Sequence, residues 1–308
     1  MVRDTIRAIM QRSHAPSVSV AVAEHGKIVW EEGFGWADVD RHVPATPNTL
    51  YSIASISKPT SATALMVLAQ RGAVDLARPA NDYLGARKIT GLAGSASEAT
   101  VQRVMSHSAG LPLHYRFFYE DRADPRPNMD EAIGRYAIVV YPPGQVYNYS
   151  NLGYGIVEQI VAHQSERPFE AYMHNAVFAP LGMPRTAIGT GRGLVRAAVR
   201  YNDSLKAIPY YDFDHRGGSA VWTTAHELVR FGMFHLRDHL SDQSPILTDS
   251  AILAMQRVRT TGVTTLGYGL GWLIDDDHGY RRVAHTAESP CRPRRTARGP
   301  VRGHYPDG

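Results

Sequence analysis

Residues 49–59 read Thr-Leu-Tyr-Ser-Ile-Ala-Ser-Ile-Ser-Lys-Pro, and this segment decides the fold and the chemistry that we expect of the chain. Apolar residues continue beyond it at helical spacing, which predicts a helix over residues 56–71. Ser55 is expected at the N-cap of this helix, and Pro59 falls in the first turn, where a missing N–H is tolerated.

Ser55 and Lys58 lie three residues apart at this helix start, so their side chains should point to the same side. A hydroxyl beside an amine is a nucleophile beside a base, provided that the amine is desolvated enough to lose its proton. A capping serine followed by an unrelated lysine is the alternative, and for an isolated pair it is the commoner case. The chain has only four lysines among its 33 Lys and Arg residues, and this favours a base because arginine cannot be deprotonated.

The composition is that of a globular protein, with 44% hydrophobic and 20% charged residues in a chain of 308. No apolar run is long enough to span a membrane, and the start lacks a signal-peptide core, so we expect a cytoplasmic protein unless a leader was removed. The single Cys291 excludes an intramolecular disulfide and a cysteine metal cluster. Five Arg and one acidic residue in 289–308 account for the net charge of +4, so the charge gives no support for a nucleic-acid or membrane partner.

The order of the expected elements predicts the fold class. Strands near both ends of the chain enclose a middle region of helices joined by Pro- and Gly-rich loops. We therefore predict an α/β (α+β) fold, with an antiparallel sheet built from both chain ends, flanking helices and an inserted helical part. The expected helices cover residues 2–12, 99–106, 151–164, 169–179 and 224–236, and the expected strands cover 17–24, 27–33, 267–274 and 280–285.

These elements predict one catalytic domain over residues 1–289. Its sheet part should comprise about 1–62 and 216–289, its helical part about 63–215, and a site should lie in the cleft between them. Composition changes to Arg, Pro and Gly in residues 290–308, which predicts a disordered tail.

Two further segments carry candidate residues. Tyr149 and Asn151 form a Tyr-x-Asn sequence after a Pro-Pro-Gly turn. A phenol can move a proton when a nearby cation lowers its pKa, and an Asn two residues on can bond both a lysine and a substrate carbonyl. The alternative is a turn before a helix. His285 ends the last expected strand, where a lone histidine is more often structural than catalytic.

Together these segments resemble the serine β-lactamase and penicillin-binding-protein superfamily. The resemblance is closest to class C β-lactamase-related serine hydrolases, which include esterases and D-amino-acid-directed peptidases. It rests on an ordered series of motifs that covers the chain up to about residue 287: residues 49–59, 107–112, 141–154, 178–183, 217–231 and 268–272.

The resemblance implies a role for each matching residue. Ser55 would attack a carbonyl and become acylated. Lys58 and Tyr149 would take its proton and pass it to the leaving group, and Asn151 would orient Lys58 and the substrate. The implied partner is a small ester or amide; no cofactor, metal, nucleic acid or membrane is expected, and the oligomeric state is left open.

In the same family His285 takes the position of the third-motif Lys or His, beside the phenol. The backbone N–H groups of Ser55 and Glu288 would form the oxyanion hole. A neutral imidazole binds the carboxylate of a β-lactam less well than an ammonium does. We therefore expect a carboxylesterase rather than a class C-type β-lactamase or D-alanyl peptidase.

The third motif departs from the family pattern after Thr286, where Ala287 and Glu288 precede a proline-rich sequence. Prolines are incompatible with central strands, so the last two strands and the C-terminal helix of the family are expected to be missing. A catalytically impaired relative that only binds a ligand is therefore a further alternative.

Overall fold

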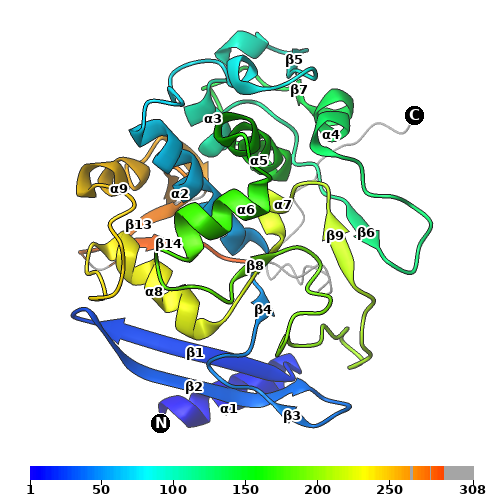
Figure 1. Ribbon diagram of the computed structural model, residues 1–308, viewed down its shortest axis with the longest axis vertical. Coiled ribbons are helices and arrows are strands. Elements are labelled where there is room, and N and C mark those ends of the chain that lie inside the picture. The colour runs from blue at the N-terminus through cyan, green and yellow to red at the C-terminus, as the bar shows by residue number, and fades with distance from the viewer. Residues whose placement is uncertain (264–265, 278, 288–308) are drawn as a thin grey trace.

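The two ends of the chain form separate antiparallel sheets, and the middle of the chain is mostly helical (Figure 1). This arrangement comes from a computed structural model, which describes residues 1–263, 266–277 and 279–287. None of the helices in these ranges is long and apolar enough to cross a membrane.

The first sheet has the order β1-β2-β3, with β1 (Ser17–Glu24), β2 (Lys27–Asp38) and β3 (Val43–Pro44). His25 and Gly26 join β1 to β2, and both have positive φ angles, 50° and 68°. Two residues with positive φ match the twist of a hairpin, so this turn sets the pairing of Glu24 with Lys27.

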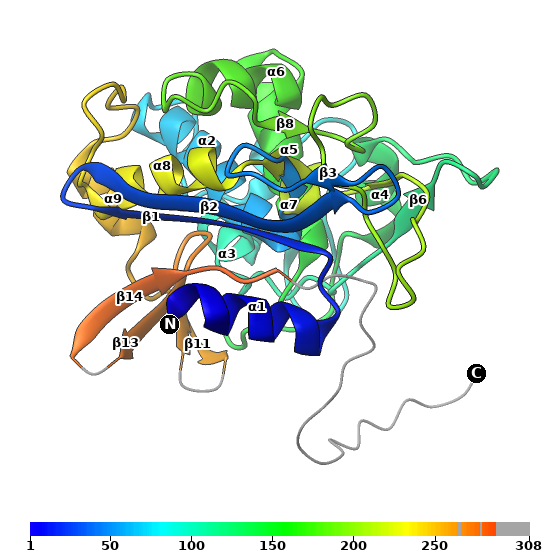
Figure 2. The ribbon, with the colours of Figure 1, turned by 90° about the horizontal axis from the view of Figure 1, so that it is seen from below.

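Helices cover both faces of this sheet (Figure 2). α1 (Val2–Ser13) packs on one face, where Arg3 pairs with Glu32 at 2.6 Å. α8 (Ala225–Leu236) packs on the other, where Nδ1 of His226 lies 2.8 Å from a carboxylate oxygen of Glu31. Successive strand residues point to opposite faces, so the neighbours Glu31 and Glu32 meet different helices.

The second sheet has the order β11-β12-β13-β14, with β11 (Thr260–Val263), β12 (Leu266–Tyr268), β13 (Leu273–Asp277) and β14 (Tyr280–Ala284). In the described ranges no strand of the first sheet pairs with a strand of the second. Both chain ends thus form antiparallel sheet, as predicted, but as two sheets rather than one. The predictions for the tail and the missing strands fall outside the described residues.

The core of the helical part is α2 (Ser57–Gln70), which is buried from Ser57 to Leu68. It packs against α5 (Asn151–Ser165) and α7 (Arg216–Ser219). A helix buried all round must satisfy its polar side chains internally. Its hydroxyls accordingly bond to nearby backbone, for example Ser61 Oγ to Gly217 O at 2.6 Å.

The remaining elements are short. The helix predicted over 169–179 is α6 (Phe169–Met173), continued by a π-helix, His174–Phe178. Aromatic residues and prolines predict a loop over 113–130, whereas this segment contains the strand β6 (Phe117–Tyr119), which pairs with β9 (Tyr211–Phe213). The remaining helices are α3 (Val101–Met105), α4 (Met129–Tyr136), α6 (Phe169–Met173) and α9 (Asp249–Met255). The remaining strands are β4 (Tyr51–Ser52), β5 (Thr90–Gly91), β6 (Phe117–Tyr119), β7 (Ile138–Val139), β8 (Ala187–Ile188), β9 (Tyr211–Phe213) and β10 (Val221–Thr223).

Candidate active site

Ser55 lies at the junction between the short strand β4 and the buried helix α2. The backbone N–H of Ile53 donates to Val221 O at 3.0 Å, and the chain then turns through a 3-10 helix, Ala54–Ile56. Ala54 adopts φ 42°, a left-handed conformation that is strained for a residue with a side chain. The N-cap of α2 is Ile56, so the prediction that Ser55 caps the helix is wrong. The strained turn presents the Ser55 hydroxyl to Lys58 instead.

Lys58 is fully buried, and its amine has three oxygen neighbours. Nζ lies 3.1 Å from Ser55 Oγ, 2.8 Å from Asn151 Oδ1 and 3.0 Å from Gly218 O. Burial holds the pKa of Lys58 well below its ordinary value. A neutral amine donates only two hydrogens, which Asn151 and Gly218 accept, and its lone pair then faces the Ser55 hydroxyl. This is the geometry of a base beside a nucleophile.

Tyr149 contributes an aromatic ring beside this amine. Lys58 Nζ lies 4.8 Å from the centroid of the Tyr149 ring. Ser150 is the N-cap of α5, and its Oγ accepts the Gly153 N–H at 3.0 Å. Tyr149 and Asn151 therefore flank a helix start, which directs both side chains to Lys58. The structure thus brings Ser55, Lys58, Tyr149 and Asn151 together.

His107 contacts Tyr149 and Ser150 at the start of α5. The sequence analysis did not identify it as a site residue. Its Nδ1 accepts the Ser150 N–H at 3.1 Å, and its ring packs on that of Tyr149 with centroids 4.3 Å apart. Burial holds the pKa of His107 well below its ordinary value. The imidazole is therefore neutral, with its proton on Nε2. The motif over residues 107–112 was the only sequence signal for it.

His285 bonds to a phenol that the sequence analysis did not select. Its Nε2 lies 3.1 Å from the Tyr268 hydroxyl, and its Nδ1 lies 2.8 Å from Thr286 O. A carbonyl only accepts, so Nδ1 donates and Nε2 accepts from Tyr268. Burial lowers the pKa of His285 to about 3, so this imidazole is neutral. The sequence analysis expected His285 beside the phenol of Tyr149 and did not foresee its bond to Tyr268. Glu288, the other predicted oxyanion residue, lies outside the described residues.

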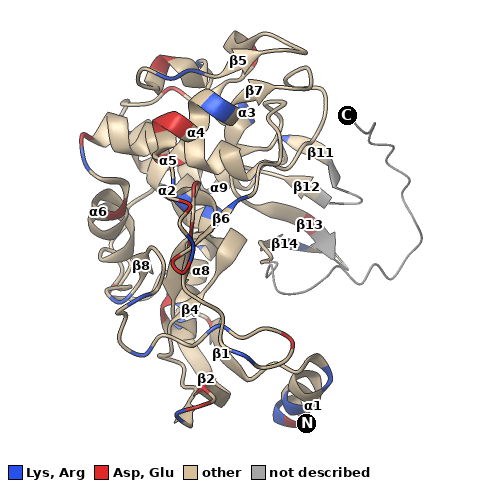
Figure 3. Cartoon of the chain, turned by 90° about the vertical axis from the view of Figure 1, so that its right-hand side faces the viewer, with Lys and Arg blue, Asp and Glu red and all other residues tan. Residues whose placement is uncertain are grey.

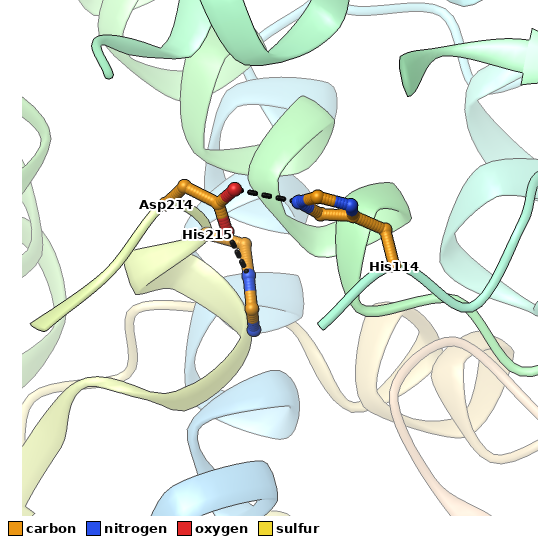
Figure 4. Close-up of side chains that lie close together, drawn as sticks. All are labelled: His114, Asp214 and His215. Carbon is orange, nitrogen blue, oxygen red and sulfur yellow. Dashed lines mark hydrogen bonds and ion pairs between the residues drawn. The ribbon is translucent and has the colours of Figure 1, made fainter. Parts of the chain in front are cut away.

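A second polar cluster joins His114, Asp214 and His215 (Figure 4). His114 Nε2 lies 2.5 Å from one oxygen of Asp214, and His215 Nδ1 lies 2.7 Å from the other. Asp214 and His215 are fully buried. Burial raises the pKa of Asp214, but the bonds from the two imidazoles outweigh it and hold that pKa well below its ordinary value. Within the described residues this is the one group whose donor set could hold a metal ion.

A buried lysine between a serine and an asparagine, at the start of the buried helix α2, is the arrangement of a serine hydrolase. The family model "Beta-lactamase" matches residues 2–293, and the chain belongs to this family.

Known relatives agree with this assignment. Protein flp of Staphylococcus aureus (strain COL) is 26% identical over 181 residues, which are 58% of this chain and 36% of that protein. Penicillin-binding protein 4* of Bacillus subtilis (strain 168) is 23% identical over 315 residues, covering 93% of this chain and 66% of the relative. The chain thus spans about a third of the length of Protein flp and two thirds of the length of the other.

Solved structures show the same fold. The octameric penicillin-binding protein homologue from Pyrococcus abyssi superimposes with a TM-score of 0.76 at 23% identity, over 93% of this chain and 67% of that one. The Beta-Lactamase/D-Alanine Carboxypeptidase from Pseudomonas syringae gives a TM-score of 0.73 at 22% identity, over 89% and 74% of the two chains.

Proposed function

We propose that this serine hydrolase forms an acyl-enzyme on Ser55 and that its substrate is a small ester. The observation that carries the proposal is the buried amine of Lys58, 3.1 Å from the Ser55 hydroxyl and bonded to two fixed oxygen atoms. The lowered pKa lets this amine give up its proton more readily than a surface lysine does, so that it can act as a base.

In the proposed reaction, Ser55 Oγ attacks the carbonyl carbon while its proton moves to Lys58. The backbone N–H of Ser55 donates to the developing oxyanion. The C–O bond to the leaving group then breaks, and Lys58 returns the proton, with the phenol of Tyr149 as relay, so that the alcohol leaves neutral. Water then attacks the acyl-serine by the same proton path, releases the acid and restores Ser55.

The state of His285 supports an ester over a β-lactam. With a pKa of about 3 the imidazole carries no charge at neutral pH. The site then has no cation at this position for the carboxylate of a β-lactam or a peptide terminus, whereas a simple ester needs none. The names of the penicillin-binding and D-alanine carboxypeptidase relatives favour the second candidate, a β-lactamase or D-alanyl peptidase. The third candidate is a relative that binds such a ligand without turnover.

A small uncharged substrate also agrees with the distribution of charge. Acidic and basic segments are interleaved along the visible helices and loops, and α1 carries both signs (Figure 3). A polyanion or an anionic membrane is normally recognised by charge of one sign gathered on one face. We therefore propose no nucleic-acid or membrane partner.

The test is intact-mass spectrometry after incubation with a fluorophosphonate probe, together with hydrolysis of a short p-nitrophenyl ester and of a chromogenic cephalosporin. We expect one adduct on the unmodified protein and on Ser52→Ala, a matched control three residues earlier, and none on Ser55→Ala. We also expect ester turnover well above cephalosporin turnover. An adduct that persists in Ser55→Ala refutes the nucleophile, and binding without an adduct supports the ligand-binding alternative. Efficient cephalosporin turnover would replace the esterase proposal by the second candidate.

A further inference from the structure

The two fixed acceptors of Lys58 come from segments far apart in the chain. Asn151 supplies a side-chain oxygen from the start of α5, and Gly218 supplies a backbone oxygen from α7. Their separation decides whether one amine can reach both while its lone pair faces Ser55. Some part of the fold must therefore hold α7 against the start of α5.

The start of α5 is held by the loop that leads to His114. Leu113 O accepts the backbone N–H of Asn151 at 2.9 Å, and Pro112 O accepts Ser150 Oγ at 2.7 Å. His114 follows directly, and its ring stacks on that of Tyr136 with centroids 4.1 Å apart. A shift of His114 would therefore be transmitted to the backbone of Asn151.

His215 holds Gly218 in a similar way. The Gly218 N–H donates to His215 O at 2.9 Å, so both residues belong to one turn. The imidazole also packs on the glycine, because a Cβ added at Gly218 would lie 3.2 Å from His215 Cδ2. The position of the His215 ring thus fixes the carbonyl that accepts from Lys58.

Asp214 connects the two segments, since one of its oxygens accepts from His114 and the other from His215 (Figure 4). We infer that Asp214 is a positioning residue, which fixes the separation of the two oxygen atoms to which Lys58 donates. Asp214 bonds to neither Ser55 nor Lys58 and acts only through these histidines. The inference rests on the proposed function, in which Lys58 is the base.

A metal ion is the competing explanation for two histidines around a carboxylate, and the distances argue against it. Ligands at about 2.0–2.1 Å from one tetrahedral zinc ion stand roughly 3.3 Å apart. The observed separations of 2.5 and 2.7 Å are those of charge-assisted hydrogen bonds. Because His215 Nδ1 donates to the carboxylate, its Nε2 carries a lone pair, which is buried and has no hydrogen-bond partner among the described residues. One donor atom does not make a zinc site, which takes three or four protein ligands.

The experiment compares Asp214→Asn with Asp214→Glu and with the control His174→Asn, which changes an exposed histidine. A carboxamide cannot accept from both imidazoles, so Asp214→Asn should lower the acylation rate constant for a short ester by about 10- to 100-fold while KM changes less than twofold. Asp214→Glu keeps a carboxylate and should recover part of the rate. His174→Asn should match the unmodified protein.

A second measurement does not need turnover. The chain has four lysines, so labelling with [ε-13C]lysine gives four NMR signals, and the spectrum of Lys58→Met assigns one of them. The Lys58 signal should titrate at lower pH in Asp214→Asn, because the ammonium form loses a well-placed acceptor. If the pKa of Lys58 is the same in Asp214→Asn as in the unmodified protein, Asp214 only stabilises the fold and the inference is overturned. This holds even if the measured rate falls, because a smaller folded fraction would lower the rate by itself. Stoichiometric Zn²⁺ binding that Asp214→Asn abolishes would overturn it in favour of a metal site. Failure of the unmodified protein to acylate would instead refute the proposed function, and the titration would still test Asp214.

Discussion

Glu158 on α5 gives a prediction whose size follows from the structure. Its side chain is buried, and Oε2 accepts the Gly217 N–H at 2.9 Å. Burial raises the pKa of Glu158 from 4.5 to about 7, although the Gly217 bond opposes this. The folded protein therefore retains a proton that the unfolded chain has already lost. The free energy of unfolding should fall as pH rises from about 4.5 to about 7, and this contribution should be constant above that range.

Glu158→Gln removes this dependence, because the amide oxygen still accepts from Gly217 and the side chain never ionises. The pKa difference, at 1.36 kcal/mol per unit, corresponds to about 3 kcal/mol. We expect the variant to be more stable than the parent by up to that amount at pH 8, and equally stable at pH 4.

Urea unfolding at intervals from pH 4 to pH 8.5 measures the effect. Glu166→Gln, at the exposed C-cap of the same helix, is the matched control and should follow the parent at every pH. A difference between Glu158→Gln and the parent that is constant across the range would refute the reasoning, because ionisation would then play no part.

Three other variants test the site and its frame. Lys58→Arg cannot deprotonate and should lower the acylation rate by about 100- to 10,000-fold in a stopped-flow ester assay; retained activity would exclude Lys58 as the base. Tyr268→Phe removes the donor to His285 and should reduce kcat about fivefold, the equivalent of ~1 kcal/mol. An unchanged kcat would show that this hydrogen bond does not contribute to catalysis. Gly110→Ala should destabilise the fold by about 2 kcal/mol or more in urea unfolding, because Gly110 has φ 72° and a Cβ there would lie 1.9 Å from Tyr141 O; wild-type stability would contradict that geometry.

The sequence predicted the extent of α2 correctly and its N-cap residue incorrectly, because it gave no sign of the turn at Ala54. Periodic apolar residues mark a buried helix, and they placed it at 56–71 against an observed Ser57–Gln70. The left-handed Ala54 carries no sequence signal, because such a conformation is usually marked by glycine. The pairing of Ile53 with Val221, distant in the chain, imposes that turn.

The sequence predicted which side chains belong to the site. It could not predict the backbone atoms and distant residues that contact them. Gly218 contributes a backbone oxygen, which every residue type possesses, so its contact with Lys58 has no sequence signature. Asp214 has no motif around it, and its bond to His114 spans 100 positions. The bond between His285 and Tyr268 joins the residue after β14 to the end of β12, two strands of one sheet, and no motif links these two residues in the sequence.

Short strands were missed for a different reason. β6 has three residues, too few for alternation to be recognised, and it pairs with residues of β9 that lie 92 to 96 positions later. Its aromatic residues were read as part of a loop, and only the long-range pairing reveals the strand.

The left-handed turn at Ala54 also limits which amino acids position 54 can accommodate. Only glycine relieves the turn, asparagine and aspartate enter it at modest cost, and β-branched side chains are excluded. A saturation library at this codon should therefore yield few soluble variants. The variants at position 54 with the highest stability should not be those with the highest kcat. A backbone that is no longer strained at this position allows the Ser55 hydroxyl more than one orientation.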